Sequence, residues 1–233
     1  MKQMVDLRAK GGGTVPELMP GLDVAIPVEV NKTPMYAIFK RVFDIAIGSV
    51  IVVLLIPILP LVALMIKLDT RGPVFFKQDR VGQNGKIFKF YKFRSMVHRA
   101  EEGIDGLNRD NEQEGPVFKI RSDPRITSVG RFLRRSSLDE IPQMFNVLKG
   151  DMTIVGPRPP LPGEVANYQP WHMSRLAVKP GITCLWQISG RSHIGFNEWM
   201  RLDIEYLKTR SFKTDLLIFL KTIPAVIGRR GAY

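Results

Sequence analysis

Hydrophobic positions dominate one stretch of this 233-residue chain, from position 45 to position 66. Its 22 residues carry no charge and 18 of them are apolar, which is long enough for a transmembrane helix. Pro57 and Pro60 lie in the middle of the run, where each removes a backbone donor and bends a helix. The pattern predicts a membrane helix that breaks at these prolines, with a straight span and a buried core helix as alternatives.

Basic residues flank this segment on both sides. They are Lys40 and Arg41 before it, and Lys67, Arg71, Lys77 and Arg80 after it. The positive-inside tendency favours keeping both flanks in the cytoplasm. A re-entrant helix-break-helix over residues 35–70 satisfies both the prolines and the charges.

Beyond the membrane segment, the pattern changes to short strands and amphipathic helices. Residues 74–81 and 86–93 are rich in aromatic and β-branched residues and are separated by Gln83-Asn84-Gly85, a hairpin signal. Helical patterns cover 128–149, 163–178 and 196–228, with interruptions expected near Ser136, Pro170 and Phe212. The apolar stretch 216–227 fits either an interfacial helix or a core-packed one.

The whole pattern predicts an α+β fold that is mostly helical. It combines the re-entrant membrane helix with a compact interfacial domain that has a small β-hairpin and amphipathic helices. The expected segments are a flexible N-terminal arm at 1–34, the membrane helix at 35–70, the compact domain at 71–228 and a tail at 229–233.

Composition narrows the choice of partners. Lys and Arg number 34 against 22 Asp and Glu, a net charge of +12 that calls for anionic lipid, a phosphorylated substrate or nucleic acid. No nucleic-acid-reading motif is present, so nucleic acid is not expected. The single Cys184 excludes an internal disulfide and a cysteine-built zinc site.

The densest group of candidate catalytic residues spans positions 130–143. Arginines at positions 131, 134 and 135 precede the carboxylate pair Asp139-Glu140. A helix start favours the ionised form of Asp139, and an ionised aspartate beside phosphate-binding arginines suits a nucleophile for phosphoryl transfer. Two adjacent carboxylates repel each other unless a cation joins them, so Mg²⁺ held by Asp139 and Glu140 is expected. The alternative is a capping box, Ser137-x-x-Glu140, that merely starts a helix.

Other candidates for phosphate binding lie elsewhere in the chain. Arg158 stands between two prolines, which suits either a fixed phosphate-binding guanidinium or a rigid surface turn. Lys92 and Arg94 are two apart on a predicted strand and share a face, where they can grip a diphosphate or form a solvated edge. For Asp203, a salt-bridged helix face is the default.

Several long blocks, in order, carry a family resemblance. They are GPVFFKQDRVGQNGKIFKFYKFRSM (72–96), DPRITSVGRFLRRSSLDEIPQMFNVLKGDMTIVGPRPP (123–160), KPGITCLWQISGR (179–191) and RLDIEYLKTRSFKTDLLIFLKTI (201–223). Together with the proline-broken apolar segment, they resemble the bacterial sugar transferases, which are small monotopic phosphoglycosyl transferases (polyprenyl-phosphate hexose-1-phosphate transferases). The likeness covers residues 40–224.

The resemblance implies an enzyme of the bacterial inner (cytoplasmic) membrane with its catalytic domain on the cytoplasmic face. The family moves hexose 1-phosphate from a UDP-sugar, here UDP-glucose or UDP-galactose, to undecaprenyl phosphate at the start of exopolysaccharide, capsule or O-antigen synthesis. Asp139 is then the nucleophile that forms an aspartyl phosphosugar and releases UMP, and Glu140 supports Mg²⁺.

The expected substrate-binding residues are Lys92, Arg94, Arg131, Arg134, Arg135, Arg158, Arg191 and Asp203. Anionic membrane lipids are further expected partners, and a homo-oligomer is compatible with the sequence. A rival hypothesis is a non-enzymatic, membrane-anchored module that binds anionic lipid, which explains the charge but not the ordered motifs.

Overall fold

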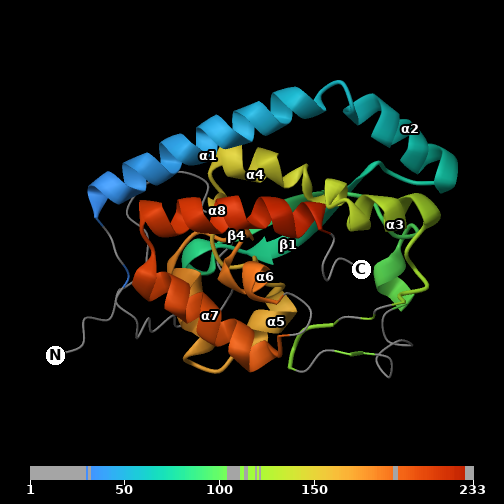
Figure 1. Ribbon diagram of the computed structural model, residues 1–233. Coiled ribbons are helices and arrows are strands. Elements are labelled where there is room, and N and C mark those ends of the chain that lie inside the picture. Colours follow the sequence, from blue (N-terminus) through green and yellow to red (C-terminus); the bar gives the residue numbers. More distant parts are fainter. Residues whose placement is uncertain are drawn as a thin grey trace, which may run out of the picture.

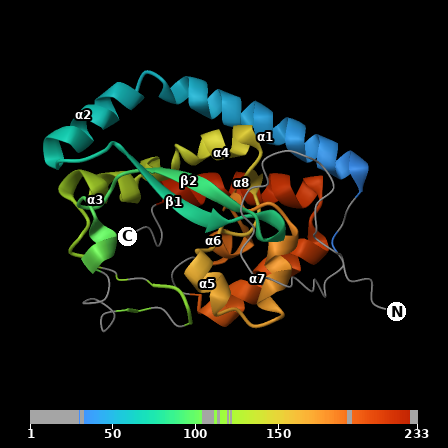
Figure 2. The same ribbon diagram turned by 180° about the vertical axis from the view of Figure 1, so that it is seen from behind.

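The computed structural model describes residues 30, 33–103, 111–112, 115–118, 120, 122–190 and 194–228. The expected N-terminal arm, apart from positions 30, 33 and 34, and the tail at 229–233 lie outside the described residues. In Figures 1 and 2, two helices form a bent pair along one side of the molecule, and a β-hairpin and the remaining helices pack beneath that pair.

The bent pair consists of α1 (Pro34–Leu55) and α2 (Leu59–Asp69), which meet at an angle of 63°. Pro57 lies between the two helices and Pro60 lies in the first turn of α2, where a missing N–H is tolerated. The predicted break is therefore confirmed. No helix in the described part of the chain is by itself long and apolar enough to cross a membrane, whereas this bent pair together meets that test by length and composition.

The β-hairpin matches its prediction. β1 (Phe75–Val81) pairs antiparallel with β2 (Ile87–Phe93), in a register that runs from Phe75 opposite Phe93 to Val81 opposite Ile87. Asn84 in the connecting turn has a φ of 57°, a left-handed conformation that asparagine tolerates well. Phe88 and Phe90 of β2 belong to the main hydrophobic core.

The helical segments also follow the pattern, with interruptions near the expected positions. In chain order the other elements are η2 (Ala100–Gly103), α3 (Ser128–Arg135), η4 (Leu138–Glu140), α4 (Gln143–Lys149), β3 (Thr153–Val155), α5 (Pro162–Ala166), η5 (His172–Ala177), β4 (Gly181–Thr183), α6 (Leu185–Ser189), α7 (Phe196–Thr209) and α8 (Phe212–Ile227). The parallel pairing of β3 with β4 was not predicted.

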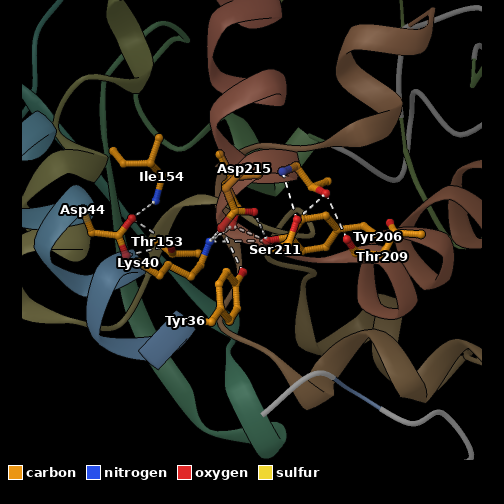
Figure 3. Close-up of polar contacts among 11 residues, drawn as sticks. Tyr36, Lys40, Asp44, Thr153, Ile154, Tyr206, Thr209, Ser211 and Asp215 are labelled. Carbon is orange, nitrogen blue, oxygen red and sulfur yellow. Dashed lines mark hydrogen bonds and ion pairs between the residues drawn. The ribbon is translucent and has the colours of Figure 1, made fainter. Parts of the chain in front are cut away.

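The first turns of α1 are fastened to the domain by a buried ion pair (Figure 3). Lys40 Nζ lies 2.7 Å from Asp215 Oδ2 of α8 and donates to the carbonyl of Val155 at 2.8 Å. The hydroxyls of Tyr36 and Tyr206 each donate to Asp215 at 2.8 Å. One carboxylate thus joins α1, α7 and α8.

A second carboxylate fastens α1 to β3. Buried Asp44 accepts from the Thr153 hydroxyl at 2.7 Å and from the Ile154 N–H at 2.9 Å. Arg41 also bonds inward, to the carbonyls of Val147 and Leu148 at 2.7 Å each. The basic residues before the apolar run are therefore engaged by the domain. We refer to Lys40, Arg41, Asp44 and Asp215 as the α1 clamp.

α8 has one buried face and one exposed apolar face, so its packing against the core is confirmed and an interfacial position stays a prediction. Asp215 and Ile218 are buried, whereas Phe212, Leu217 and Leu220 are exposed. Its inner face packs against β3 and β4, and its outer face is apolar and open.

Candidate active site

Asp139 and Glu140 lie in a tight turn between two short helices. α3 ends at Arg135, and Ser137 then adopts a left-handed φ of 56°, which leads the chain into the single turn of η4. The turn buries the side chain of Asp139 but leaves that of Glu140 35% exposed. Ser137 makes no side-chain capping bond, so the capping-box alternative is wrong.

Lys92 supplies the cation beside this carboxylate pair. β2 places its Nζ 2.7 Å from Glu140 Oε1 and 3.6 Å from Asp139 Oδ2. Burial raises the pKa of Asp139; the Lys92 charge is the largest influence that lowers this pKa, and the Glu140 charge raises it further. The expectation that a helix start keeps Asp139 ionised is not supported, because Asp139 lies in the single turn of η4, α4 begins only at Gln143, and the pKa of Asp139 is raised. The Lys92 charge is the main influence that opposes this rise.

Of the three arginines of α3, the structure brings Arg134 to the site. Its Nε donates to the Ser95 hydroxyl at 2.9 Å, and its charge helps to lower the pKa of Asp139. Burial in turn lowers the pKa of Arg134 itself. Arg131 and Arg135 are exposed.

Arg158 lies in the proline-rich loop 156–160 that follows β3. Its guanidinium carbon stands 5.6 Å from the centroid of the Trp199 ring, a cation–π contact. Beneath the loop, Arg175 donates to the carbonyl of Arg158 at 2.9 Å and lies 2.7 Å from the Asp203 carboxylate. Both Arg175 and Asp203 are almost fully buried, so Asp203 reaches the site only through Arg175 and this loop. Burial raises the pKa of Asp203 to about 6, against the lowering effect of Arg175.

Two other predicted binding residues are not placed at the carboxylate pair. Arg94 follows Lys92 by two residues, but its guanidinium donates to the carbonyls of Ile66, Thr70 and Arg71 at distances of 3.3, 2.7 and 2.8 Å. It therefore fastens the end of α2 to the end of β2. Arg191 lies outside the described residues.

Sequence reasoning missed two buried arginines, Arg80 and Arg175. Arg80 was counted with the basic flank of the membrane segment, but it is only 8% exposed. Alternation along β1 places it on the same face as Gln78, and the register with β2 puts Phe90 on that face too. The strand pattern could have revealed this inward position. No signal in the sequence pairs Arg175 with Asp203.

The carboxylate pair offers an incomplete donor set for a metal. Among the described residues, no cluster of three or more His, Cys, Asp or Glu could hold one. Asp139 and Glu140 supply two carboxylates, and Mg²⁺ commonly binds one or two carboxylates together with waters and substrate phosphates. The residues fit a Mg²⁺ ion that shares its coordination with a phosphate group.

Comparisons with known proteins agree with this chemistry. The family model described as "Bacterial sugar transferase" matches residues 35–229. The exopolysaccharide production protein ExoY of Rhizobium meliloti (strain 1021) is 38% identical over 89% of this chain and 94% of its own length. The undecaprenyl-phosphate galactose phosphotransferase of Salmonella typhimurium is 42% identical over 83% of this chain, and the undecaprenyl-phosphate glucose phosphotransferase of Komagataeibacter xylinus is 40% identical over 83%.

The relatives differ in how much of their own length this chain spans. It covers nearly all of the exopolysaccharide production protein, but only 41% of the galactose phosphotransferase and 37% of the glucose phosphotransferase. The match therefore concerns less than half of each of those two longer proteins.

Proposed function

This chain belongs to the bacterial sugar transferase family, and from that premise we propose that it is a membrane phosphoglycosyl transferase. It moves hexose 1-phosphate from a UDP-hexose to undecaprenyl phosphate and releases UMP, as the first membrane step of exopolysaccharide, capsule or O-antigen synthesis. The observation that carries the proposal is buried Asp139 beside Lys92 and Arg134. The names of the two phosphotransferase relatives support glucose or galactose as the hexose.

The reaction proceeds by two displacements at one phosphorus atom. A carboxylate oxygen of Asp139 attacks the phosphorus that bears the sugar, the bond to the bridging oxygen breaks, and UMP leaves with that oxygen. A phosphate oxygen of undecaprenyl phosphate then attacks the aspartyl phosphosugar and frees the carboxylate. Each step exchanges one phosphoryl bond for another, so positioning and charge neutralisation are the main demands on the protein.

Different side chains supply the charge neutralisation and the positioning. Lys92 holds Asp139 in the ionised form that attacks, and Arg134 adds a second positive charge near the same carboxylate. Arg158 offers a planar guanidinium to the nucleotide, held in place by a proline on each side and by Arg175 below.

Mg²⁺ is proposed as the metal, with Asp139 and Glu140 as its protein ligands. When bound, it neutralises the charge that develops on the transferred phosphoryl group. We expect excess EDTA to stop UMP release and added Mg²⁺ to restore it, with Glu140→Gln severely impaired. Full activity in EDTA would remove the metal from the proposal.

We further propose that α1 and α2 form a re-entrant membrane hairpin. Large apolar side chains are exposed along it, and the open face of α8 extends this surface; examples are Val53, Leu54, Ile56, Leu61, Leu64 and Leu217. Both ends of the bent pair are fastened to one domain, by the α1 clamp at the start and by Arg94 at the end of α2. These attachments favour placing both ends on the same side of the bilayer.

The domain is proposed to face the cytoplasm, because UDP-sugars are made there and the exposed flank residues Lys67, Arg71 and Lys77 are basic. The acceptor lipid is anchored in the bilayer and the donor is soluble. A site next to the end of a membrane hairpin lets both reach Asp139.

UMP release tests the enzymatic proposal. The full chain, purified in detergent, is mixed with UDP-glucose or UDP-galactose, with or without undecaprenyl phosphate. We expect continuous UMP release only with the lipid phosphate, and without it a burst limited to the amount of enzyme. Asp139→Asn should fold but show neither. A non-enzymatic lipid-binding module would release no UMP under any of these conditions.

A further inference from the structure

Arg80 lies buried on the face of the hairpin that points toward the active site. Its Nε and one terminal nitrogen donate to the Gln78 amide oxygen at 3.1 and 2.8 Å. The other terminal nitrogen donates to the carbonyl of Pro159 at 3.0 Å. Arg80 therefore connects β1 with the loop that carries Arg158.

Arg80 and Arg175 donate to the carbonyls of two neighbouring loop residues, Pro159 and Arg158. The two arginines differ in whether a carboxylate contacts the guanidinium. Arg175, which holds the carbonyl of Arg158, has the Asp203 carboxylate 2.7 Å away. Across the described parts of the chain, no carboxylate lies within 4 Å of the Arg80 guanidinium, and its bonding partners are neutral. Burying a charge without a counterion in contact costs folding free energy.

The surroundings of Arg80 carry charges of both signs. Burial, and next the charge of Arg158, lower the pKa of Arg80 to about 9, and the carboxylates of Glu164 and Glu140 oppose that fall. On the same strand face, the Phe90 ring has the Arg80 guanidinium 5.2 Å and the Lys92 ammonium 5.7 Å from its centroid. The ring thus contacts both the cation of the carboxylate pair and the cation that holds the Arg158 loop, and the charge of Glu140 acts on Arg80. An anion that reaches from Asp139 to Arg158 would be close to Arg80.

We propose that Arg80 is a positioning residue for the phosphate groups of the nucleotide. It fixes the Arg158 loop through the carbonyl of Pro159. Its charge, which no carboxylate of the described residues contacts, adds to that of Arg158 and attracts the phosphates of a nucleoside diphosphate sugar and of the nucleoside monophosphate product. This inference rests on the proposed function, because that function supplies the anion.

A comparison of UMP with uridine separates this role from a merely structural one. Dissociation constants of both ligands are measured by ligand-observed NMR on the full chain in detergent. The two ligands differ by the phosphate, so the ratio of their Kd values reports phosphate recognition, and uridine binding reports an intact nucleoside site. The variants are Arg80→Gln and Arg80→Lys, with Lys89→Gln as the matched control. Lys89 lies on the same hairpin with an exposed side chain, and its ion pair in the described part of the chain is with Asp79 at 2.8 Å.

We expect Arg80→Gln to weaken UMP binding by about 10- to 100-fold, the scale of a lost charge-assisted interaction, with little change for uridine. Arg80→Lys keeps the charge and should retain most of the preference for UMP, and Lys89→Gln should match the unmodified chain. The proposal is overturned if Arg80→Gln keeps the preference, if it weakens both ligands equally, or if Arg80→Lys loses the preference as fully as Arg80→Gln. If the unmodified chain neither binds UMP nor releases it from a UDP-hexose, the proposed function is wrong, and this inference, which depends on that function, is wrong as well.

Discussion

Lys92 is the residue on which the charge state of Asp139 depends. A carboxylate must be ionised to attack phosphorus, yet burial of Asp139 favours its neutral form. Glu140 next to it adds a like charge, and Lys92 forms ion pairs with both carboxylates. For the proposed reaction, Lys92 near the end of β2 therefore has to offset the effect of burial on the pKa of Asp139.

The pH dependence of the reaction should reveal this role. In the proposed mechanism Asp139 attacks as the ionised carboxylate, so kcat/KM should fall on the acid side as pH drops through the pKa of that group. Lys92→Gln removes the largest influence that lowers this pKa, so the acid limb should move to higher pH. Lys89→Gln removes an exposed charge from the same strand and should leave the limb in place. An acid limb that stays in place in Lys92→Gln would mean that another group controls the ionisation of Asp139.

Candidate site residues could be selected where one local motif carries them. The Asp139-Glu140 pair follows a run of arginines and Arg158 stands between prolines, so the sequence alone singles them out. The structure brings Lys92 and Arg134 to Asp139, and the catalytic and binding roles of these residues stay predictions. Arg94 and Arg80 were assigned elsewhere because their partners are carbonyls of distant segments, at the end of α2 and in the loop after β3. Such partners are fixed by tertiary packing, and a single sequence does not encode them locally.

At the scale of elements, turn and break signals were reliable. Asn84-Gly85 gave the hairpin, and Pro57 gave the bend between α1 and α2, because both act through local backbone geometry. The β3–β4 pair escaped prediction for the opposite reason. Each strand has only three residues, and their parallel pairing joins segments nearly thirty residues apart.

The α1 clamp should make α1 an integral part of the catalytic domain. Lys40→Met breaks its ion pair and leaves the Asp215 carboxylate, 2% exposed, without its cation. We expect a loss of about 2–4 kcal/mol in the free energy of unfolding, measured by chemical denaturation in detergent. Lys89→Met, which breaks the exposed pair with Asp79, should cost about 0–1 kcal/mol. Adding Asp215→Leu to Lys40→Met should recover part of the loss, because no buried charge is then left unpaired. Equal costs for the two single variants would show that the ion pair does not hold α1.

At the scale of the whole molecule, the contacts that fasten the bent pair to the domain are a more direct argument for a re-entrant membrane topology than the flanking charges are. Lys40 and Arg41 bond to groups of the domain, and Arg94 fastens the other end of the pair. For the chain before α1 to cross the bilayer, α1 would have to leave β3, α4 and α8. The prolines make the bend, and the α1 clamp opposes its opening.

Accessibility of the N-terminal arm can separate these two influences. A thiol is introduced at Thr14 in a Cys184→Ser background and tested with a membrane-impermeant reagent in intact cells, with permeabilised cells as the control for reactivity. We expect the arm to be protected in the otherwise unmodified chain and also in Pro57→Leu with Pro60→Leu, because the α1 clamp still holds. Adding Lys40→Met and Asp44→Leu to the two proline changes releases α1 and allows a straight apolar span of about 30 Å, enough to cross the bilayer. The arm should then be labelled from outside. Labelling of the unmodified chain would contradict the re-entrant arrangement, and labelling of the double-proline variant alone would show that the prolines, and not the α1 clamp, control topology.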